Sequence, residues 1–419
     1  MNPEKGGNRA YYYRNLHRWL ALSRESASHL FGEGEESVRI LQCRAGTAVL
    51  AATIMSGVMT AQTRPRARDL GISPGIGIPG ASNAITDVAG VRVGHATVTT
   101  GENVRTGVAA VLPHGGNLFR EKVAGAVFVG NAFGKLAGST QVQELGTIET
   151  PIVLTNTLAV GTAVEAVTRW TIQQSGNEDV RSVNALVGET NDGTLNDIRG
   201  FHVTVTHVQS AIASATEGPV AEGAVGAGAG TVAFGWKGGI GTSSRRVRSS
   251  IDQGPDWTVG VLVQTNYGGR LTIAGVPVWR ELSPPSPRGP ARRADDADGS
   301  CMIVVATDAP LDARDLERLA ARAIFAMART GSTYSNGSGD FAIAFSTHPS
   351  LRVSRGSAPQ ARTILPTDGV STLFEGVLDA TEEAIYNSML QAVDTTGNGR
   401  TVRALPVESL RSTLKKYGR

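Results

Sequence analysis

Short runs of apolar residues alternate with longer amphipathic segments along the chain from Asp69 onward. The runs are rich in β-branched side chains and are bounded by turn residues, which is typical of strands in a sheet. The segments that predict strands are 107–113, 124–130, 150–156, 183–189, 201–208, 258–266, 301–307 and 340–347. No internal repeat interrupts this order. The pattern predicts an α/β protein in which helices are layered over sheet.

Three segments carry helical rather than strand periodicity. Residues 161–176 form the first clear amphipathic segment, and residues 378–393 form the last, with a polar tail after it. Between them, Asp308 and Pro310 open a helix whose apolar residues recur at helical spacing. These residues are Leu316, Leu319, Ala320, Ala323, Ile324 and Met327. Such a helix is expected to pack on a sheet.

Two segments stand apart from the folded pattern. Residues 281–299 are rich in proline, arginine and acidic residues, which predicts a flexible exposed linker. Residues 1–61 are treated as an N-terminal extension outside the fold. Their last part contains a basic residue, then an apolar run, and then small residues near Ala61. This order is the pattern of a signal peptide. The run is too short for a stable membrane span.

The location of the protein depends on where translation begins. A start at Val38 would give an exported, periplasmic form, whereas a start at Met55 would give a cytoplasmic form. The pattern slightly favours export, and both locations remain open. In either case we expect no membrane span in the mature protein.

Composition excludes several classes of function. The formal net charge is only +3, and the arginines fall in short groups without interleaved aromatic residues, which argues against nucleic-acid binding. Two cysteines, Cys43 and Cys301, are too few for a disulfide framework or a cysteine metal site. His202 and His207 are the closest histidines, and on a strand they would point to opposite faces. We therefore expect no metal and no cofactor.

Two glycine motifs resemble known sites only superficially. Residues 223–245 are rich in glycine, but Gly238 follows Lys237, so the Gly-Lys-Ser/Thr ending of a phosphate loop is absent. The glycines instead indicate backbone that passes close to another group, a substrate included. The letters Gly-Ile-Ser-Pro-Gly around Ser73 match a nucleophile elbow, but Pro74 prevents the required strand-turn-helix context.

The Gly299-Ser300 pair, at the junction of the linker and a strand, offers more specific chemistry. A serine hydroxyl can attack the preceding carbonyl in an N-to-O acyl shift, and hydrolysis of the ester then frees the serine α-amine. That amine, with an ordinary pKa of about 7.7–8.0, can act as general base for its own hydroxyl. Gly299 leaves the carbonyl sterically open. The alternative is a linker that simply ends in a turn.

Other polar residues lie where they could support such a serine. Ser335, Asn336, Ser338 and Asp340 precede a strand, and alternation puts Ser338 and Asp340 on one side, where they could tune the Ser300 amine. Asn266 ends another strand, where its amide could donate to an oxyanion. Taken singly, each is more often a turn residue.

At these residues the chain resembles the L-aminopeptidase/D-alanine esterase-amidase family, which includes the β-peptidyl aminopeptidases. The similarity runs from near Arg66 to about Val393 and includes "ITDVAGVRVGH", "VGETNDGTLND", "GGIGTSSR", "DGSCMIVVATDAPL" and "GSTYSNGSGDFAIAFST". The resemblance implies a four-layer αββα sandwich made as one precursor. It further implies self-cleavage between Gly299 and Ser300 into a large chain, 62–299, and a small chain, 300–419, which assemble into homo-oligomers.

The resemblance also assigns roles to individual residues. Ser300 would be the nucleophile, with Ser338 and Asp340 as its supports and Asn266 as the oxyanion donor. Asp340 stands where some relatives have Glu. Glu189 would meet the free ammonium group of the substrate, and Asn156 would line the pocket. Thr194 stands where relatives often have Tyr, which puts rate or acyl-group preference in question.

The sequence therefore leads to three hypotheses of different kinds. The first is a self-processing serine aminopeptidase that acts on small peptides, amides and esters with a free amino group through an acyl-enzyme on Ser300. The second is an acetyltransferase like the self-cleaving ornithine enzymes, which normally use Thr as nucleophile. The third is a non-enzymatic binding protein, which would not cleave itself. The sequence does not distinguish D-alanyl, L-α and β-amino acyl substrates.

Overall fold

A computed structural model describes residues 64–248, 254–285, 299–354, 356 and 358–419. Its larger sheet has seven strands, in the order β10-β11-β12-β13-β3-β14, with β5 added beside β3. The strands are β10 (Gly239–Val247), β11 (Trp257–Asn266), β12 (Ser300–Thr307), β13 (Gly339–Ser346), β3 (Glu121–Ala132), β14 (Val353–Ser354) and β5 (Thr147–Ile148). Strand β12 lies inside this sheet, antiparallel to β11 and parallel to β13.

A second sheet of five strands packs against the first, in the order β1-β2-β6-β7-β4. Its strands are β1 (Arg92–Thr100), β2 (Val104–Leu112), β6 (Ile152–Asn156), β7 (Leu186–Thr190) and β4 (Leu136–Ala137). Two small ribbons complete the strands of the described residues. They are formed by β8 (Val232–Ala233) with β9 (Trp236–Lys237) and by β15 (Thr395–Gly397) with β16 (Arg400–Val402).

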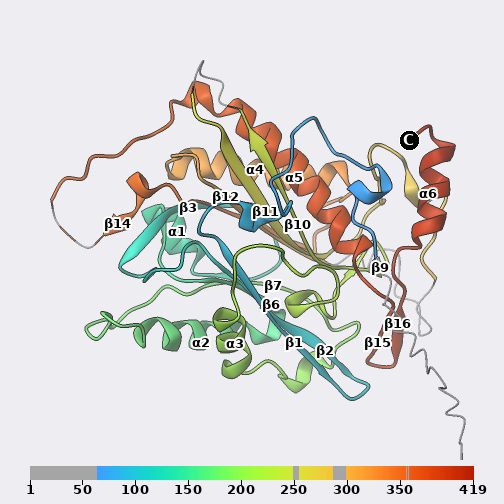
Figure 1. Cartoon of the computed structure of the whole chain (residues 1–419). Coiled ribbons are helices and arrows are strands. Elements are labelled where there is room, and N and C mark those ends of the chain that lie inside the picture. The colour runs from blue at the N-terminus through green and yellow to red at the C-terminus, as the bar shows by residue number, and fades with distance from the viewer. Residues whose placement is uncertain (1–63, 249–253, 286–298, 355, 357) are drawn as a thin grey trace, which may run out of the picture. The chain divides into compact units, whose positions relative to one another are not determined.

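Helices cover the outer face of each sheet, so that the described residues form layers of helix, sheet, sheet and helix (Figure 1). Helices α4 (Ala313–Arg329) and α5 (Ser371–Leu390) lie on the seven-stranded sheet, and α2 (Val160–Ile172) and α3 (Val205–Ala213) lie on the five-stranded sheet. The shorter helices are α1 (Ser139–Leu145) and α6 (Val407–Lys416). The protein is thus a layered mixed α/β structure.

Three apolar cores correspond to the three boundaries between these layers. On β12, Cys301, Ile303 and Val305 belong to the core under α4 and α5. Met302 and Val304 on the same strand belong to the core between the two sheets. A third core fills the space between the five-stranded sheet and α2 and α3. Both faces of β12 are covered, which explains why its sequence is apolar without interruption.

Most elements predicted from the sequence are present. Seven of the eight predicted strands correspond to β2, β3, β6, β7, β11, β12 and β13, and the first predicted helix is α2. Helix α4 begins at Ala313, with the side chain of Asp312 accepting a hydrogen bond from the Asp315 backbone N–H. Its six predicted apolar positions are all buried. Helix α5 begins earlier than predicted, at Ser371.

The strand predicted for residues 201–208 was wrong, because helix α3 begins at Val205. Thr204 caps this helix: its hydroxyl accepts from the His207 backbone N–H, and the His207 ring accepts from the Thr204 N–H. The cap outweighs the strand preference of the neighbouring β-branched residues. His202 and His207 therefore do not lie on opposite faces of a strand.

The polar tail expected after residue 393 was also wrong. That part of the chain contains β15, β16 and α6, and Leu410 and Leu414 of α6 are buried. These two leucines lie one turn apart, so they share the face on which the otherwise polar helix packs.

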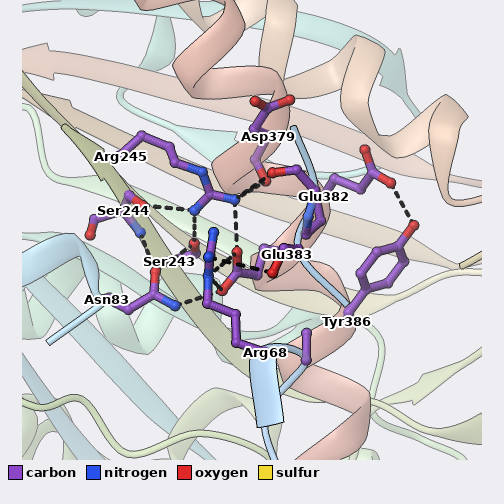
Figure 2. Close-up of polar contacts among 12 residues, drawn as sticks. Arg68, Asn83, Ser243, Ser244, Arg245, Asp379, Glu382, Glu383 and Tyr386 are labelled. Atoms are coloured by element: carbon purple, nitrogen blue, oxygen red, sulfur yellow. Dashed lines mark hydrogen bonds and ion pairs between the residues drawn. The ribbon is translucent and has the colours of Figure 1, made fainter. Parts of the chain in front are cut away.

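A buried polar cluster joins the first described segment to the helix layer above the larger sheet (Figure 2). Glu383 of α5 is fully buried and accepts hydrogen bonds from Arg68, Asn83 and Arg245. Arg245 of β10 is also fully buried and donates to the backbone oxygens of Pro74 and Asp379. We call Arg68, Asn83, Arg245 and Glu383 the clasp. It makes residues 64–87 an integral part of the fold.

Two predictions fall mainly on residues that the structure does not describe. The N-terminal extension, residues 1–61, lies outside the described residues, as do residues 286–298 of the predicted linker. Within the described part of the chain, no helix is both long enough and apolar enough to span a membrane.

Candidate active site

Ser300 is the first residue of β12 and lies where three strand ends meet. It pairs with Asn266, the last residue of β11, and with Gly339, the first residue of β13. Partners directly opposite each other in a sheet share a face, so the side chains of Ser300 and Asn266 are neighbours. Ser300 is only 5% exposed. The structure therefore brings the predicted nucleophile beside the predicted oxyanion donor.

The backbone N–H of Gly339 is a functional group that the sequence did not reveal. It lies 3.1 Å from the carbonyl oxygen of Gly299 and 3.3 Å from Oγ of Ser300. It can therefore donate to the carbonyl that a self-cleavage reaction would attack. Because the group belongs to the main chain, residue identity gives no signal for it. The only sequence clue is the glycine between Ser338 and Asp340.

Gly299 is constrained by its neighbours as well as by its chemistry. A Cβ atom at this position would lie 2.1 Å from the Asn266 carbonyl oxygen and 2.5 Å from Cα of Tyr267. Real Cβ atoms do not approach backbone so closely, so only glycine fits without a shift of the strand ends. Glycine is thus required at position 299 by packing, in addition to leaving the carbonyl open as predicted.

The side chain of Asn266 is fixed at one end. Its Oδ1 atom accepts a hydrogen bond of 2.9 Å from the Val232 backbone N–H. A carboxamide whose oxygen is held by a donor presents its NH₂ group away from that donor. This orientation leaves the NH₂ group to serve an oxyanion.

Ser338 and Asp340 share a face, as alternation predicted, but it is not the face of the Ser300 hydroxyl. Asp340 pairs with Cys301 and lies near Tyr267, on the side covered by α4 and α5. Burial raises the pKa of Asp340 to about 6, while Ser338 and the Cys301 backbone lower it. Neither carboxylate oxygen makes a well-formed hydrogen bond. From this side Asp340 faces the backbone at the start of β12 rather than the hydroxyl.

The turn before β13 is tied to β3. The main-chain oxygens of Ser335 and Asn336 accept hydrogen bonds from the side chain of Asn131. Their role in the structure is therefore to hold the turn that delivers Ser338 and Gly339.

Glu189 lies at the end of β7 and is only 2% exposed. Its Oε1 atom accepts from the Lys135 backbone N–H at 3.0 Å, and the Lys135 ammonium lies 3.7 Å away. Gly134 lies between this carboxylate and Gly339: a Cβ there would lie 3.3 Å from Oε1 of Glu189 and 3.0 Å from Cα of Gly339. An acidic group thus stands next to the strand end that carries the Gly339 N–H.

The two remaining candidate residues contribute differently. Asn156 is buried, and its Oδ1 caps the short 3₁₀ helix Thr157–Ala159 while its Nδ2 donates to Thr106. Its amide is therefore largely engaged in structure. Thr194 is half-buried in the turn after β7. Among the described residues, no hydrogen bond joins its side chain to Ser300.

The arrangement is suited to acyl transfer. It combines a serine with a nearby amide donor, a backbone donor and two carboxylates on different sides. Among the residues that the structure describes, no group of three histidine, cysteine or acidic side chains is placed to hold a metal ion.

Comparison with known proteins identifies relatives over most of the chain. The family model for Peptidase family S58 matches residues 83–402. The beta-peptidyl aminopeptidase BapA of Sphingosinicella microcystinivorans is 44% identical over 396 residues, which cover 89% of this chain and 97% of that protein. BapA of Sphingosinicella xenopeptidilytica is 40% identical over 390 residues, covering 88% and 95%.

Solved structures show the same similarity. The PH0078 protein of Pyrococcus horikoshii OT3 matches with a TM-score of 0.78 and 47% identity, covering 85% of this chain and all of that one. A beta-aminopeptidase of a Burkholderia species matches with a TM-score of 0.76 and 39% identity, covering 85% and 99%. The L-aminopeptidase D-Ala-esterase/amidase of Ochrobactrum anthropi, described as a variant of the Ntn hydrolase fold, gives 0.78 and 38%, covering 85% and 99%.

Proposed function

The chain belongs to peptidase family S58 and is an aminopeptidase, and on this basis we propose that it activates itself by cleaving the bond between Gly299 and Ser300. One observation carries the proposal: a single N–H, that of Gly339, lies within hydrogen-bonding distance of both the Gly299 carbonyl oxygen and Ser300 Oγ. The nucleophile and the carbonyl it must attack thus share one donor.

Cleavage would proceed by an acyl shift. Ser300 Oγ attacks the Gly299 carbonyl carbon, and negative charge develops on an oxygen already bonded to the Gly339 N–H. The C–N bond breaks, the hydroxyl proton passes to the departing nitrogen, and an ester forms. Water then hydrolyses the ester, which yields a carboxylate at Gly299 and restores the hydroxyl of Ser300. The product is a large chain ending at Gly299 and a small chain, 300–419, that begins with a free amine.

Hydrolysis of a substrate would use that amine. The unprotonated α-amine accepts the hydroxyl proton while Oγ attacks the substrate carbonyl and forms an acyl-enzyme. The proton then passes to the leaving amine or alcohol. A water molecule, deprotonated by the same amine, releases the acid product. The Asn266 NH₂ group and the Gly339 N–H would stabilise both tetrahedral intermediates.

The carboxylates would have separate tasks in this scheme. Asp340, assisted by Ser338, would stabilise and orient the new ammonium at Ser300 from the α4 side of the sheet. Glu189 would bind the free ammonium of the substrate, because an opposite charge in a buried site gives a strong charge-assisted contact. Asn156 and Thr194 would shape the pocket wall.

The substrate class follows from the relatives and from Glu189. Two relatives are named beta-peptidyl aminopeptidases and another an L-aminopeptidase D-Ala-esterase/amidase. We propose small peptides, amides and esters with a free amino group as substrates. We also propose that the two chains stay together within one αββα protomer, that such protomers form a homo-oligomer, and that no cofactor takes part.

Denaturing gels and intact-mass measurement test the proposal. The wild-type protein should give two fragments that meet at Gly299–Ser300 and should hydrolyse the p-nitroanilides of β-alanine, D-alanine or L-amino acids. Ser300→Ala should remain whole and inactive, whereas Ser354→Ala, which changes an exposed serine, should behave as wild type. An active protein that stays uncut would refute the proposal. Acetyl transfer from N-acetylornithine to glutamate would instead support the acetyltransferase alternative.

A further inference from the structure

Lys237 is a buried cation that the proposed reaction does not use. It lies on β9, within the glycine-rich segment 223–245, and none of its side chain is exposed. Lysine is almost never fully buried unless its charge is compensated. Burial lowers the pKa of Lys237 to about 7, and Asp192 is the charged side chain that acts to raise it. An apolar residue of similar size at this position would often give a more stable protein than a buried ammonium does.

The ammonium group of Lys237 holds the main chain of the glycine-rich segment. Its Nζ atom donates to the carbonyl oxygens of Gly228, at 2.8 Å, and Gly238, at 2.9 Å. Thr231 strengthens the same link, because its hydroxyl donates to the Gly228 oxygen and its own carbonyl accepts from the Gly238 N–H. Residues 226–232 are thus fastened to the strand that carries the lysine.

The backbone of this segment also packs closely against neighbouring backbone. A Cβ at Gly228 would lie 2.5 Å from the Ile240 backbone nitrogen, and one at Gly230 would lie 2.1 Å from the Arg105 carbonyl oxygen. The glycines therefore serve close packing of backbone on backbone. This packing accounts for the glycine-rich pattern without any phosphate ligand.

The fastened segment ends at the oxyanion donor. Val232 follows Thr231 directly, and its N–H donates to Oδ1 of Asn266 at 2.9 Å. Asn266 in turn lies opposite Ser300 in the sheet. Hydrogen bonds through the main chain thus connect the Lys237 ammonium to the carboxamide of Asn266.

We propose that Lys237 is a positioning residue for catalysis, which fixes residues 226–232 so that Val232 holds the Asn266 carboxamide in the orientation that stabilises the oxyanion. This inference rests on the proposed function. It adds a residue to that reaction that neither contacts the substrate nor exchanges a proton with it.

Lys237→Met removes the ammonium and keeps an unbranched side chain of similar length. The variant should lower kcat by about ten- to a hundredfold with KM within about twofold, because loss of an oxyanion donor costs about 10²–10³ in kcat and misplacement forfeits part of that. Self-cleavage should slow in the same proportion. Thr231→Val, which removes one hydroxyl from the same link, should give a smaller loss of the same kind and supplies the test if Lys237→Met does not fold.

A double-mutant cycle with Asn266→Ala separates positioning from a general structural effect. If Lys237 acts through Asn266, the lysine change should have little further effect once the carboxamide is gone. The rate of fragment formation from purified precursor provides the readout if Asn266→Ala matures slowly. Arg245→Met is the control, since it removes a buried cation of the clasp, and its effect should multiply with that of Asn266→Ala.

Three results would overturn the inference. The first is an unchanged kcat in both Lys237→Met and Thr231→Val, and the second is a pair of lysine and asparagine effects that multiply. The third is a rise in KM at constant kcat, because it would place Lys237 in substrate binding. If Ser300→Ala is inactive and uncut while the cycle is multiplicative, only this inference fails. If Ser300→Ala remains active, the proposed function fails first.

Discussion

Asp340 would suit the uncleaved chain and the proposed cleaved chain differently. With Gly299 and Ser300 joined in one chain, the Asp340 carboxylate is buried without a well-formed hydrogen bond. A charged Asp340 is therefore unfavourable before cleavage. The ammonium that cleavage would create at Ser300 supplies the missing opposite charge, so the proposed reaction relieves this cost.

Asp340→Asn in an uncleavable Ser300→Ala background tests this view. The folded pKa, about 6, lies above the ordinary value of 3.8. The stability linked to this group is therefore full at low pH and is lost as pH rises through about 6. Asparagine does not titrate, so it avoids this loss. Between pH 4 and pH 8 the free energy of unfolding of the asparagine variant should therefore rise by about 2 kcal/mol relative to that of its parent. Denaturant unfolding at both pH values measures the gain, and equal pH dependence in the two proteins would contradict it.

Lys135 permits a test of the ammonium site at Glu189. Its half-exposed ammonium lies near the carboxylate that would bind the substrate amine and also donates to Thr157. Lys135→Met removes a competing, like-charged group whose own ion pair is worth little at the surface. We expect KM for an aminoacyl p-nitroanilide to fall about three- to tenfold with kcat nearly constant.

Lys122→Met is the matched control for this variant, because Lys122 also pairs with a buried glutamate, Glu149, but on β3 away from Ser300. Its KM should not change. A KM that rises in Lys135→Met would show instead that the lysine helps to bind substrate.

At the scale of elements, the start of β12 must remain continuous with its neighbours for the acyl shift to occur. Gly299→Ala places a methyl group 2.1 Å from the Asn266 oxygen. The strand ends must then separate, and we expect self-cleavage to slow at least tenfold, since small misplacements of reacting groups cost large factors in rate. Timed denaturing gels of the precursor measure it.

Gly161→Ala is the control for the glycine change. Gly161 lies in α2, where a methyl group added to its Cα would have nothing within 4 Å, so alanine should leave cleavage unchanged. It should also stabilise the protein by about 0.5–1 kcal/mol, since alanine favours helix. Normal cleavage in Gly299→Ala would show that the close approach is not required.

The elements also show what the sequence could and could not predict. Strands buried on both faces, such as β12, were recognisable because their runs are continuously apolar. Helix α3 was missed because its cap at Thr204 lies within a β-branched stretch. Helix α6 was missed because its buried apolar residues, Leu410 and Leu414, lie in a mostly polar segment. Elements held by a few local or tertiary contacts leave a weak periodic signal.

The candidate site divides in the same way. Ser300 and Asn266 were proposed from their chemistry and from the family resemblance, and Glu189 was proposed from the resemblance alone. Their geometry could not be predicted, because strand register decides that Asn266 lies opposite Ser300, and register depends on tertiary pairing. Strand register also decides that the Gly339 N–H lies beside Ser300 and that Asp340 lies on the opposite face. Neither could therefore be predicted from residue type.

At the scale of the molecule, the clasp would join the two chains that cleavage produces. Arg68, Asn83 and Arg245 belong to the proposed large chain, and Glu383 belongs to the small one (Figure 2). Because these contacts cross the chains and do not involve β12, cleavage would leave them intact. The fragments should therefore elute together until the protein is denatured.

Glu383→Gln tests the contribution of the clasp. The change leaves the Arg245 guanidinium buried without its anionic partner, and breaking such a pair costs about 3–5 kcal/mol. Denaturant unfolding should report a loss of that size. Glu165→Gln, which removes an exposed pair with Arg169 in α2, should cost no more than about 0.5 kcal/mol. Similar losses in both variants would show that the buried clasp contributes no more to stability than an exposed ion pair does.

The location of Ser300 at the end of an interior strand has an evolutionary consequence. The proposed reacting atoms lie on a sheet that is covered on both faces, while Phe133, Thr157 and Thr194 are exposed or half-buried and border or follow the elements that carry the proposed site. Diversification of acyl preference among related enzymes can then be confined to those turns. Retargeting the protein to a new amino acyl group should start there and leave the hydrolytic machinery untouched.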